Sequence, residues 1–93
     1  MKDRLLIIGA GGHGRVIADI ALKMKKWKSI SFLDNDRSIM SSMEIAVIDK
    51  SDNATHYIRE NDIFVAIGSN TIREEVQKRL EAEGASIPVL IHP

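Results

Sequence analysis

The chain has 93 residues, which is enough for one small domain and too few for two. Hydrophobic residues make up 44% and charged residues 28%, so the composition is globular and excludes the collagen-like, disordered and low-complexity classes. Thirteen basic and thirteen acidic residues balance to a net charge of zero, and the chain therefore lacks the net basic field with which proteins bind nucleic acid.

The sequence also narrows the possible membrane, redox and metal chemistry. No apolar run approaches the ~20 residues that cross a bilayer, and residues 1–4 lead into a strand-like run without a signal-peptide cleavage pattern. We therefore expect a cytoplasmic protein with no membrane partner. The absence of cysteine excludes disulfides and thiolate ligands, and the three histidines are too scattered for a metal site.

Short apolar runs alternate with segments of helical periodicity. The continuous run at 5–8 predicts a strand buried on both faces, because a sheet with one wet face would show alternation. Amphipathic spacing predicts a helix over 14–26, and a second apolar run predicts a strand over 30–33. A polar loop through Ser42 and a weaker strand at 44–48 are expected next.

The second half of the chain follows the same alternation. A short helix is expected over 52–60, and a buried strand over 63–67. The next helix is expected to open at Asn70 or Thr71, where residues 71–74 match the capping-box spacing, and Gly84 is placed for its C-terminal cap. A last strand is predicted over 87–91. Such alternation predicts parallel βαβ units with right-handed crossovers.

The predicted fold class is therefore α/β. We expect one domain over residues 1–93, with a small open parallel sheet of about five strands in the order 3-2-1-4-5 and helices on both faces. Ligands in such sheets bind at the carboxyl edge, where the strand order reverses, which here lies between the first and fourth strands. Side chains in the loops at that edge are therefore the candidates for a site.

Residues 9–14 match G-x-G-x-x-G between a predicted strand and a predicted helix, the context that gives this motif its meaning. Gly9 permits the tight turn, Gly11 leaves the backbone open to a ligand, and Gly14 lets the helix pack closely on the strand. The unpaired amides of the first helical turn favour a phosphate. The motif predicts a Rossmann-like nucleotide site, and the alternative is a turn needed only for packing.

Polar residues follow two other strands at the same predicted edge. Asp34 lies twenty residues after Gly14, where a carboxylate can accept hydrogen bonds from a ribose or a base, and the alternative is an ordinary turn. Asn70 is expected to face a ligand or to be only a helix cap, and Arg73 is expected to face a ligand or the solvent. His13 is expected to contact a ligand, to have a structural role or to transfer a proton. The candidate binding residues are Gly9, Gly11, Gly12, His13, Gly14, Asp34, Asn35, Asp36, Gly68, Ser69, Asn70 and Arg73, and none is assigned a catalytic role.

Four motifs in this order resemble the N-terminal domain of bacterial hexapeptide-repeat sugar acetyltransferases, which include sialic acid O-acetyltransferases and bacillosamine-pathway N-acetyltransferases. The motifs are the runs 6–16, 32–36, 65–70 with Arg73, and 90–93, and they cover essentially the whole chain. The resemblance implies a Rossmann-like domain that binds a nucleotide-sugar acceptor, UDP-linked where the acceptor is an amino sugar. It also implies a following left-handed β-helix that binds acetyl-CoA and forms a trimer.

The resemblance further implies roles for individual segments. Residues 11–14 would hold the phosphates, 34–36 would meet the uridine, and 68–70 with Arg73 would border the same pocket, although Ser69 stands where Asp is frequent in the family. The general-base histidine lies in the β-helix, so this chain is expected to bind the acceptor, to hold no cofactor and to be inactive alone. The alternatives are an NAD-binding fragment of a dehydrogenase and a non-catalytic regulatory or interaction module.

Overall fold

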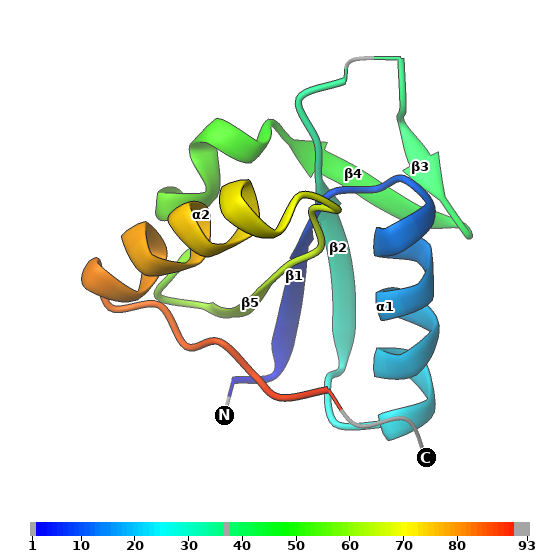
Figure 1. Ribbon diagram of the computed structural model, residues 1–93. Coiled ribbons are helices and arrows are strands. Elements are labelled where there is room, and N and C mark those ends of the chain that lie inside the picture. The colour runs from blue at the N-terminus through cyan, green and yellow to red at the C-terminus, as the bar shows by residue number, and fades with distance from the viewer. Residues whose placement is uncertain (1, 37, 91–93) are drawn as a thin grey trace.

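A computed structural model describes residues 2–36 and 38–90 (Figure 1). The alternation of strands and helices confirms the α/β class. In chain order, the elements are β1 (Arg4–Ile8), α1 (Gly12–Met24), β2 (Ser29–Leu33), β3 (Ser41–Ser42), β4 (Ile45–Asp49), the 3-10 helix η1 (Ser51–Tyr57), β5 (Asn61–Val65) and α2 (Asn70–Ala82).

Four parallel strands form the sheet in the order β4-β2-β1-β5, and the short β3 pairs antiparallel with the outer edge of β4. This order confirms the predicted arrangement 3-2-1-4. The central strand β1 is paired on both sides, and Leu6, for example, lies opposite Ser31 of β2 and Ile63 of β5. A strand enclosed in this way must be apolar throughout, which explains the continuous hydrophobic run at 5–8.

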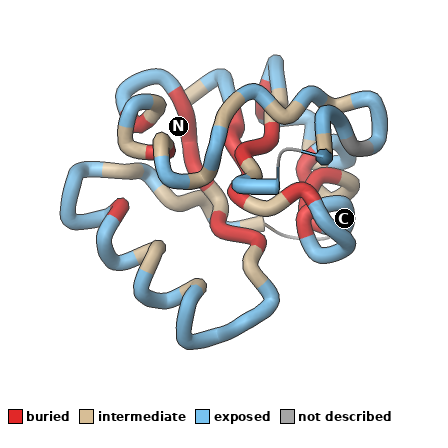
Figure 2. Tube along the Cα trace, turned by 90° about the horizontal axis from the view of Figure 1, so that it is seen from above, coloured by how far each residue is buried: buried red, intermediate tan, exposed pale blue. Residues whose placement is uncertain are grey.

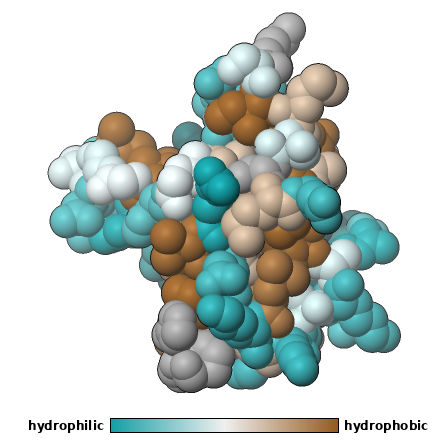
Figure 3. Space-filling view, turned by 90° about the vertical axis from the view of Figure 1, so that its right-hand side faces the viewer, coloured by the Kyte–Doolittle hydropathy of each residue, from teal (hydrophilic) through white to brown (hydrophobic). Residues whose placement is uncertain are grey.

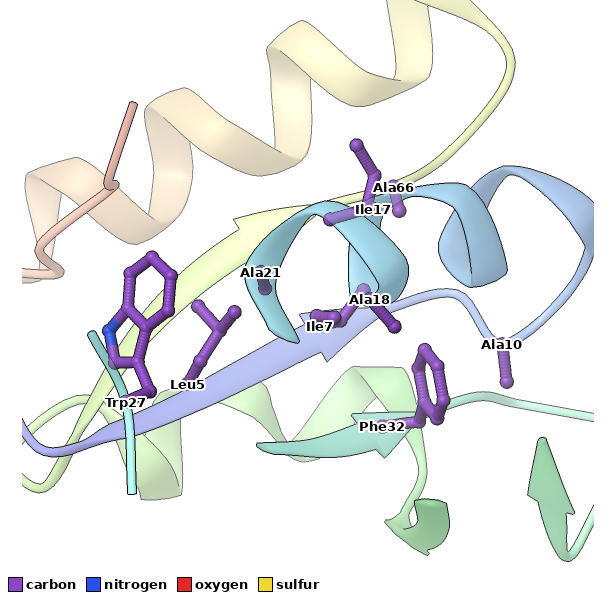
Figure 4. Close-up of a cluster of buried hydrophobic side chains, with 9 residues drawn as sticks. All are labelled: Leu5, Ile7, Ala10, Ile17, Ala18, Ala21, Trp27, Phe32 and Ala66. Carbon is purple, nitrogen blue, oxygen red and sulfur yellow. The ribbon is translucent and has the colours of Figure 1, made fainter. Parts of the chain in front are cut away.

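Helices cover both faces of the sheet, as predicted. Leu5 and Ile7 pack under α1, whereas Leu6 and Ile8 pack under η1 and α2, because successive strand residues point to opposite faces. Figure 4 shows the cluster under α1, with Trp27 beside Leu5 at one end. Buried residues lie in the middle of the trace and exposed ones form its outline (Figure 2).

The helix α1 begins two residues earlier than predicted and contains part of the glycine turn. Ile17, Ala18 and Ala21 form its buried face, and Val16 and Leu22 are its exposed hydrophobic residues. Figure 3 shows the side of the molecule on which α1 lies, with hydrophobic and hydrophilic groups intermixed. No helix in residues 2–36 and 38–90 combines the length and the apolar character that a membrane crossing requires.

Both ends of α2 are fixed by caps. The hydroxyl of Ser69 accepts a hydrogen bond from the amide of Ile72, so the capping residue is Ser69 and the predicted cap at Asn70 or Thr71 is wrong. The predicted C-terminal cap is confirmed, because Gly84 has a φ of +96° and the amide of Ala85 donates to the carbonyl of Leu80 at 3.0 Å. These bonds satisfy the last carbonyl groups of the helix.

The predicted last strand over 87–91 is not observed. Ser86 forms one isolated parallel bridge with Asp62, and the described residues after it belong to no strand, while residue 91 lies outside the described part. Pro88 has no backbone N–H to donate to a strand ladder. Leu90 packs against the cluster under α1, so the segment crosses to that face of the molecule.

Two other segments differ from their predicted form. The short helix expected over 52–60 is a 3-10 helix that ends at Tyr57. The strand predicted over 63–67 is β5, which begins at Asn61 and ends at Val65. The prediction missed its start because the second residue, Asp62, is polar and yet buried. The indole N–H of Trp27 donates to the Asp62 carboxylate at 2.9 Å, and a contact between residues this far apart in sequence leaves no local pattern.

The hairpin between β3 and β4 was not predicted. Its turn contains Met43 and Glu44, which both have positive φ, at 55° and 64°. Two-residue hairpin turns need this conformation because it matches the twist of the strands, but they are usually built from Asn-Gly. The sequence therefore lacks the ordinary composition of such a turn, and the backbone is strained at both residues.

Replacing this turn tests that strain. The double substitution Met43→Asn with Glu44→Gly is expected to raise the free energy of unfolding by about 1 kcal/mol, because both residues tolerate positive φ. The measurement is urea unfolding. The control, Met40→Asn with Ser41→Gly, changes neighbouring residues outside the positive-φ region and should give no gain. Equal effects of the two double variants would contradict the strain.

Candidate functional site

The turn between β1 and α1 depends on two close backbone approaches. Gly9 has a φ of +105°, and a Cβ at this position would lie 2.7 Å from the carbonyl oxygen of Ala66 at the end of β5. A Cβ on Gly14 would overlap the carbonyl oxygen of Gly9. Only glycine fits at either place, so these two residues have the packing roles that the sequence predicts.

The opposite side of the turn is open. Side chains at Gly11 or Gly12 would meet no atom within 4 Å, and His13 beside them is exposed. Gly11 is the N-cap of α1, and in residues 2–36 and 38–90 no side-chain or loop acceptor bonds to the amides of Gly12, His13 or Gly14. These amides and the positive end of the helix dipole form an arrangement that binds anions.

Asp34 ties the glycine turn to the loop after β2. Its carboxylate accepts one hydrogen bond from the amide of Ala10 and one from the amide of Asp36, both at 2.8 Å. The side chain is half-buried and links loops that are 24 residues apart. The expected contact with a ribose or a base therefore remains a prediction. Each carboxylate oxygen keeps a further lone pair that could accept such a hydrogen bond.

The next two residues are fixed by separate hydrogen bonds. The Asn35 carboxamide donates to the Asp52 carboxylate and accepts from the Asp52 amide, both at 3.4 Å, which joins the loop to η1. Asp36 accepts from the amide of Ser38 at 2.9 Å and from its hydroxyl at 2.6 Å. The hydroxyl and then the amide of Ser38 lower the pKa of Asp36, so this exposed residue is ionised at neutral pH.

The loop after β5 contributes the third group of predicted residues. Gly68 and Ser69 lead into α2, and the Arg73 guanidinium in its first turn donates to the Asn70 carboxamide at 2.6 Å. Because β5 and β2 flank β1, this loop and the loop after β2 lie on either side of the glycine turn, at the upper edge of the sheet in Figure 1. The structure thus brings the three predicted loops to one edge.

A cavity of about 240 Å³ lies next to these loops, between the ends of β2 and β4. The sequence predicts a crevice between β1 and β5, whereas this cavity is on the other side of Asp34. Its volume approaches the lower limit of ordinary small-molecule sites. The lining residues are Asp34, Asp36, Ile39, Met40, Val47, Ile48, Asp49 and Lys50, and half of these residues are apolar.

Asp49 at the end of β4 is a cavity residue that was missed in the sequence. Its carboxylate accepts hydrogen bonds from Asn53, from the Tyr57 hydroxyl and from the amide of Lys50, each at 2.7 Å. The bond from Asn53, and then those from Tyr57 and the amide of Lys50, lower the pKa of Asp49, while the bond to Asp49 raises the pKa of Tyr57. An acidic residue directly after a strand, as at Asp34, was the available indication.

A family model supplies the first comparison with known proteins. The model described as the PglD N-terminal domain matches residues 4–80, which is most of the chain. The chain belongs to the PglD N-terminal domain family. This membership confirms the resemblance to the N-terminal domain of sugar acetyltransferases that the four motifs indicated.

Solved structures agree with membership of the PglD N-terminal domain family. The acetyltransferase domain of PglB from Neisseria gonorrhoeae FA1090, solved with acetyl coenzyme A, is 38% identical with a TM-score of 0.91, over 100% of this chain and 45% of that chain. Perosamine N-acetyltransferase from Caulobacter crescentus, solved with CoA and GDP-perosamine, is 24% identical with a TM-score of 0.83, over 96% of this chain and 42% of that one, which shows a shared fold. This chain thus spans less than half of either.

Substitution of Asp49 tests the hydrogen-bonded cluster at the end of β4. Tyr57 is the single tyrosine, so its phenolate absorbance can be titrated directly. In the wild type, ionisation should occur above pH 10.0, and the stability that the bond contributes is lost as the pH rises through that raised pKa. Asp49→Asn should return the titration toward 10.0, whereas Asp52→Asn should not. An unchanged titration in Asp49→Asn would contradict the contact.

The two kinds of glycine in the turn can be distinguished by the effect of their substitution on the stability of the protein. Gly14→Ala should lower the free energy of unfolding by about 3 kcal/mol or more, because the added methyl overlaps the Gly9 carbonyl. Gly12→Ala, in the same helix turn, should change it by no more than about 1 kcal/mol because the space is open. Urea unfolding provides the comparison, and equal losses in the two variants would be inconsistent with this packing.

Proposed function

We propose that this chain is the domain that binds the nucleotide-sugar acceptor of an acetyl-CoA-dependent sugar O- or N-acetyltransferase. The observation that carries the proposal is the open N-terminus of α1, whose free amides lie directly after the central strand in a member of the PglD N-terminal domain family. Such an end favours a diphosphate. The Caulobacter structure, which shares the fold, was solved with GDP-perosamine, a ligand of this class.

The charges around the site support one orientation of the ligand. The diphosphate lies against the amides of 11–14, where His13 can donate a further hydrogen bond. The nucleoside points toward Asp34 and the cavity, because carboxylates accept hydrogen bonds from ribose and base but repel phosphate. The sugar points toward Asn70 and Arg73 on the other side of the turn. A UDP-linked acceptor is proposed, as the family resemblance implies for an amino sugar.

The remaining parts of the reaction are proposed to come from outside these 93 residues. The Neisseria structure contains acetyl coenzyme A and is more than twice as long as the segment that matches this chain. In the proposed reaction, a sugar amine or hydroxyl attacks the thioester carbonyl, its proton passes to the general-base histidine of the β-helix, and the CoA thiolate leaves and is protonated to the thiol. We propose that this chain alone binds the acceptor in the cytoplasm without transferring an acetyl group, and that it is trimeric only together with the β-helix.

Calorimetric titration with UDP, UMP, NAD and acetyl-CoA tests the proposal. UDP should bind, and Gly11→Val should weaken it by at least about tenfold because the new side chain occupies the open space above the amides. The control is Gly84→Asn, in which Asn tolerates the positive φ and the site is untouched. Selective binding of NAD would instead favour a dehydrogenase-type fragment, and binding of no nucleotide would favour an interaction module.

A further inference from the structure

Most of the polar residues described in the lining of the cavity between β2 and β4 are acidic. Among the lining residues that the structure describes, Asp34, Asp36 and Asp49 carry carboxylates and Lys50 carries an ammonium group. Each carboxylate is held by at least two hydrogen bonds, from backbone amides or neighbouring side chains. Ligands that enter therefore meet fixed negative charges rather than mobile ones, which makes the cavity sensitive to ligand charge.

An acetyltransferase of the proposed kind must distinguish two ligands of related chemistry. Both a nucleotide sugar and acetyl-CoA contain a nucleoside diphosphate, so either could place a diphosphate on the amides of 11–14. They differ at the ribose, where CoA carries an additional phosphate on the 3′ oxygen and the nucleotide sugar has a free hydroxyl. The Caulobacter structure was solved with both kinds of ligand.

We propose that the acidic cavity between β2 and β4 admits the unphosphorylated ribose of the acceptor and rejects acetyl-CoA through repulsion of its 3′-phosphate. This inference rests on the proposed function, in which the ribose lies beside Asp34. There a hydroxyl can donate to a carboxylate, whereas a phosphate dianion faces Asp34 and Asp36. Repulsion between two like charges in close contact lowers affinity by roughly tenfold for each pair.

Attraction and repulsion thus come from the same side chains. Selectivity of this kind needs an element that penalises the competing ligand as well as one that binds the correct ligand. Asp36 and Asp49 have lowered pKa values, so both remain charged at neutral pH. Within residues 2–36 and 38–90, Lys50 is the lining residue of opposite charge, and it should partly offset the repulsion.

CoA and dephospho-CoA provide a matched pair of probes, because they differ only in the 3′-phosphate. In calorimetric competition against UDP, dephospho-CoA should bind at least about tenfold more tightly than CoA. Asp36→Asn should reduce this ratio several-fold, and Lys50→Gln should increase it. The ratio compares two ligands on one protein, so a general loss of stability in a variant affects both values alike.

Several outcomes would overturn the proposal. Equal affinities for CoA and dephospho-CoA would show that the cavity ignores the phosphate. A lack of binding by both, with UDP bound, would show that the base or the pantetheine arm, and not the 3′-phosphate, decides the selectivity. Charge substitutions at Asp36 and Lys50 that shift the ratio in the same direction would exclude electrostatic repulsion. Absence of UDP binding would instead contradict the proposed function itself, and with it this inference.

Discussion

The close approach of α1 to the end of β1 is the constraint on which the rest of the site depends. It exists because Gly9 and Gly14 have no side chains. The backbone of Gly14 therefore packs against the carbonyl of Gly9, and the backbone of Gly9 packs against the carbonyl of Ala66. This packing places the first turn of α1, with its unpaired amides, at the carboxyl edge of the sheet. The carboxylate of Asp34 then fixes this turn to the neighbouring strand through the amide of Ala10.

Charge divides the site into two parts. The helix N-terminus offers positive partial charge, while the adjacent cavity presents three carboxylates that are held by hydrogen bonds. Asp34 joins the two parts, because its carboxylate accepts a hydrogen bond from the amide of Ala10 in the glycine turn and also lines the cavity. The proposed ligand class, a nucleoside diphosphate sugar, has a matching pattern, with a negative diphosphate at its centre and a neutral, hydroxyl-rich ribose beside it.

Much of this arrangement could be predicted from the sequence, because it is encoded locally. The apolar run at 5–8 and the glycines of 9–14 determine the central strand and the turn, and the alternation of strands and helices indicates the strand order around them. The contributions of Asp34 and Asp49 could not be predicted fully, because their partners lie on other elements of the fold. The missing strand at 87–91 was a different error, since Pro88 had already removed a donor.

Amide NMR of the chain during titration with UDP tests the central claim most directly. Binding at the helix N-terminus predicts that the largest shifts occur at the amides of Gly11, Gly12, His13 and Gly14, with smaller ones in the loop 34–36. The amides of the capped end of α2, around Gly84, should not change. Shifts that spare residues 11–14 while UDP binds elsewhere would contradict the account.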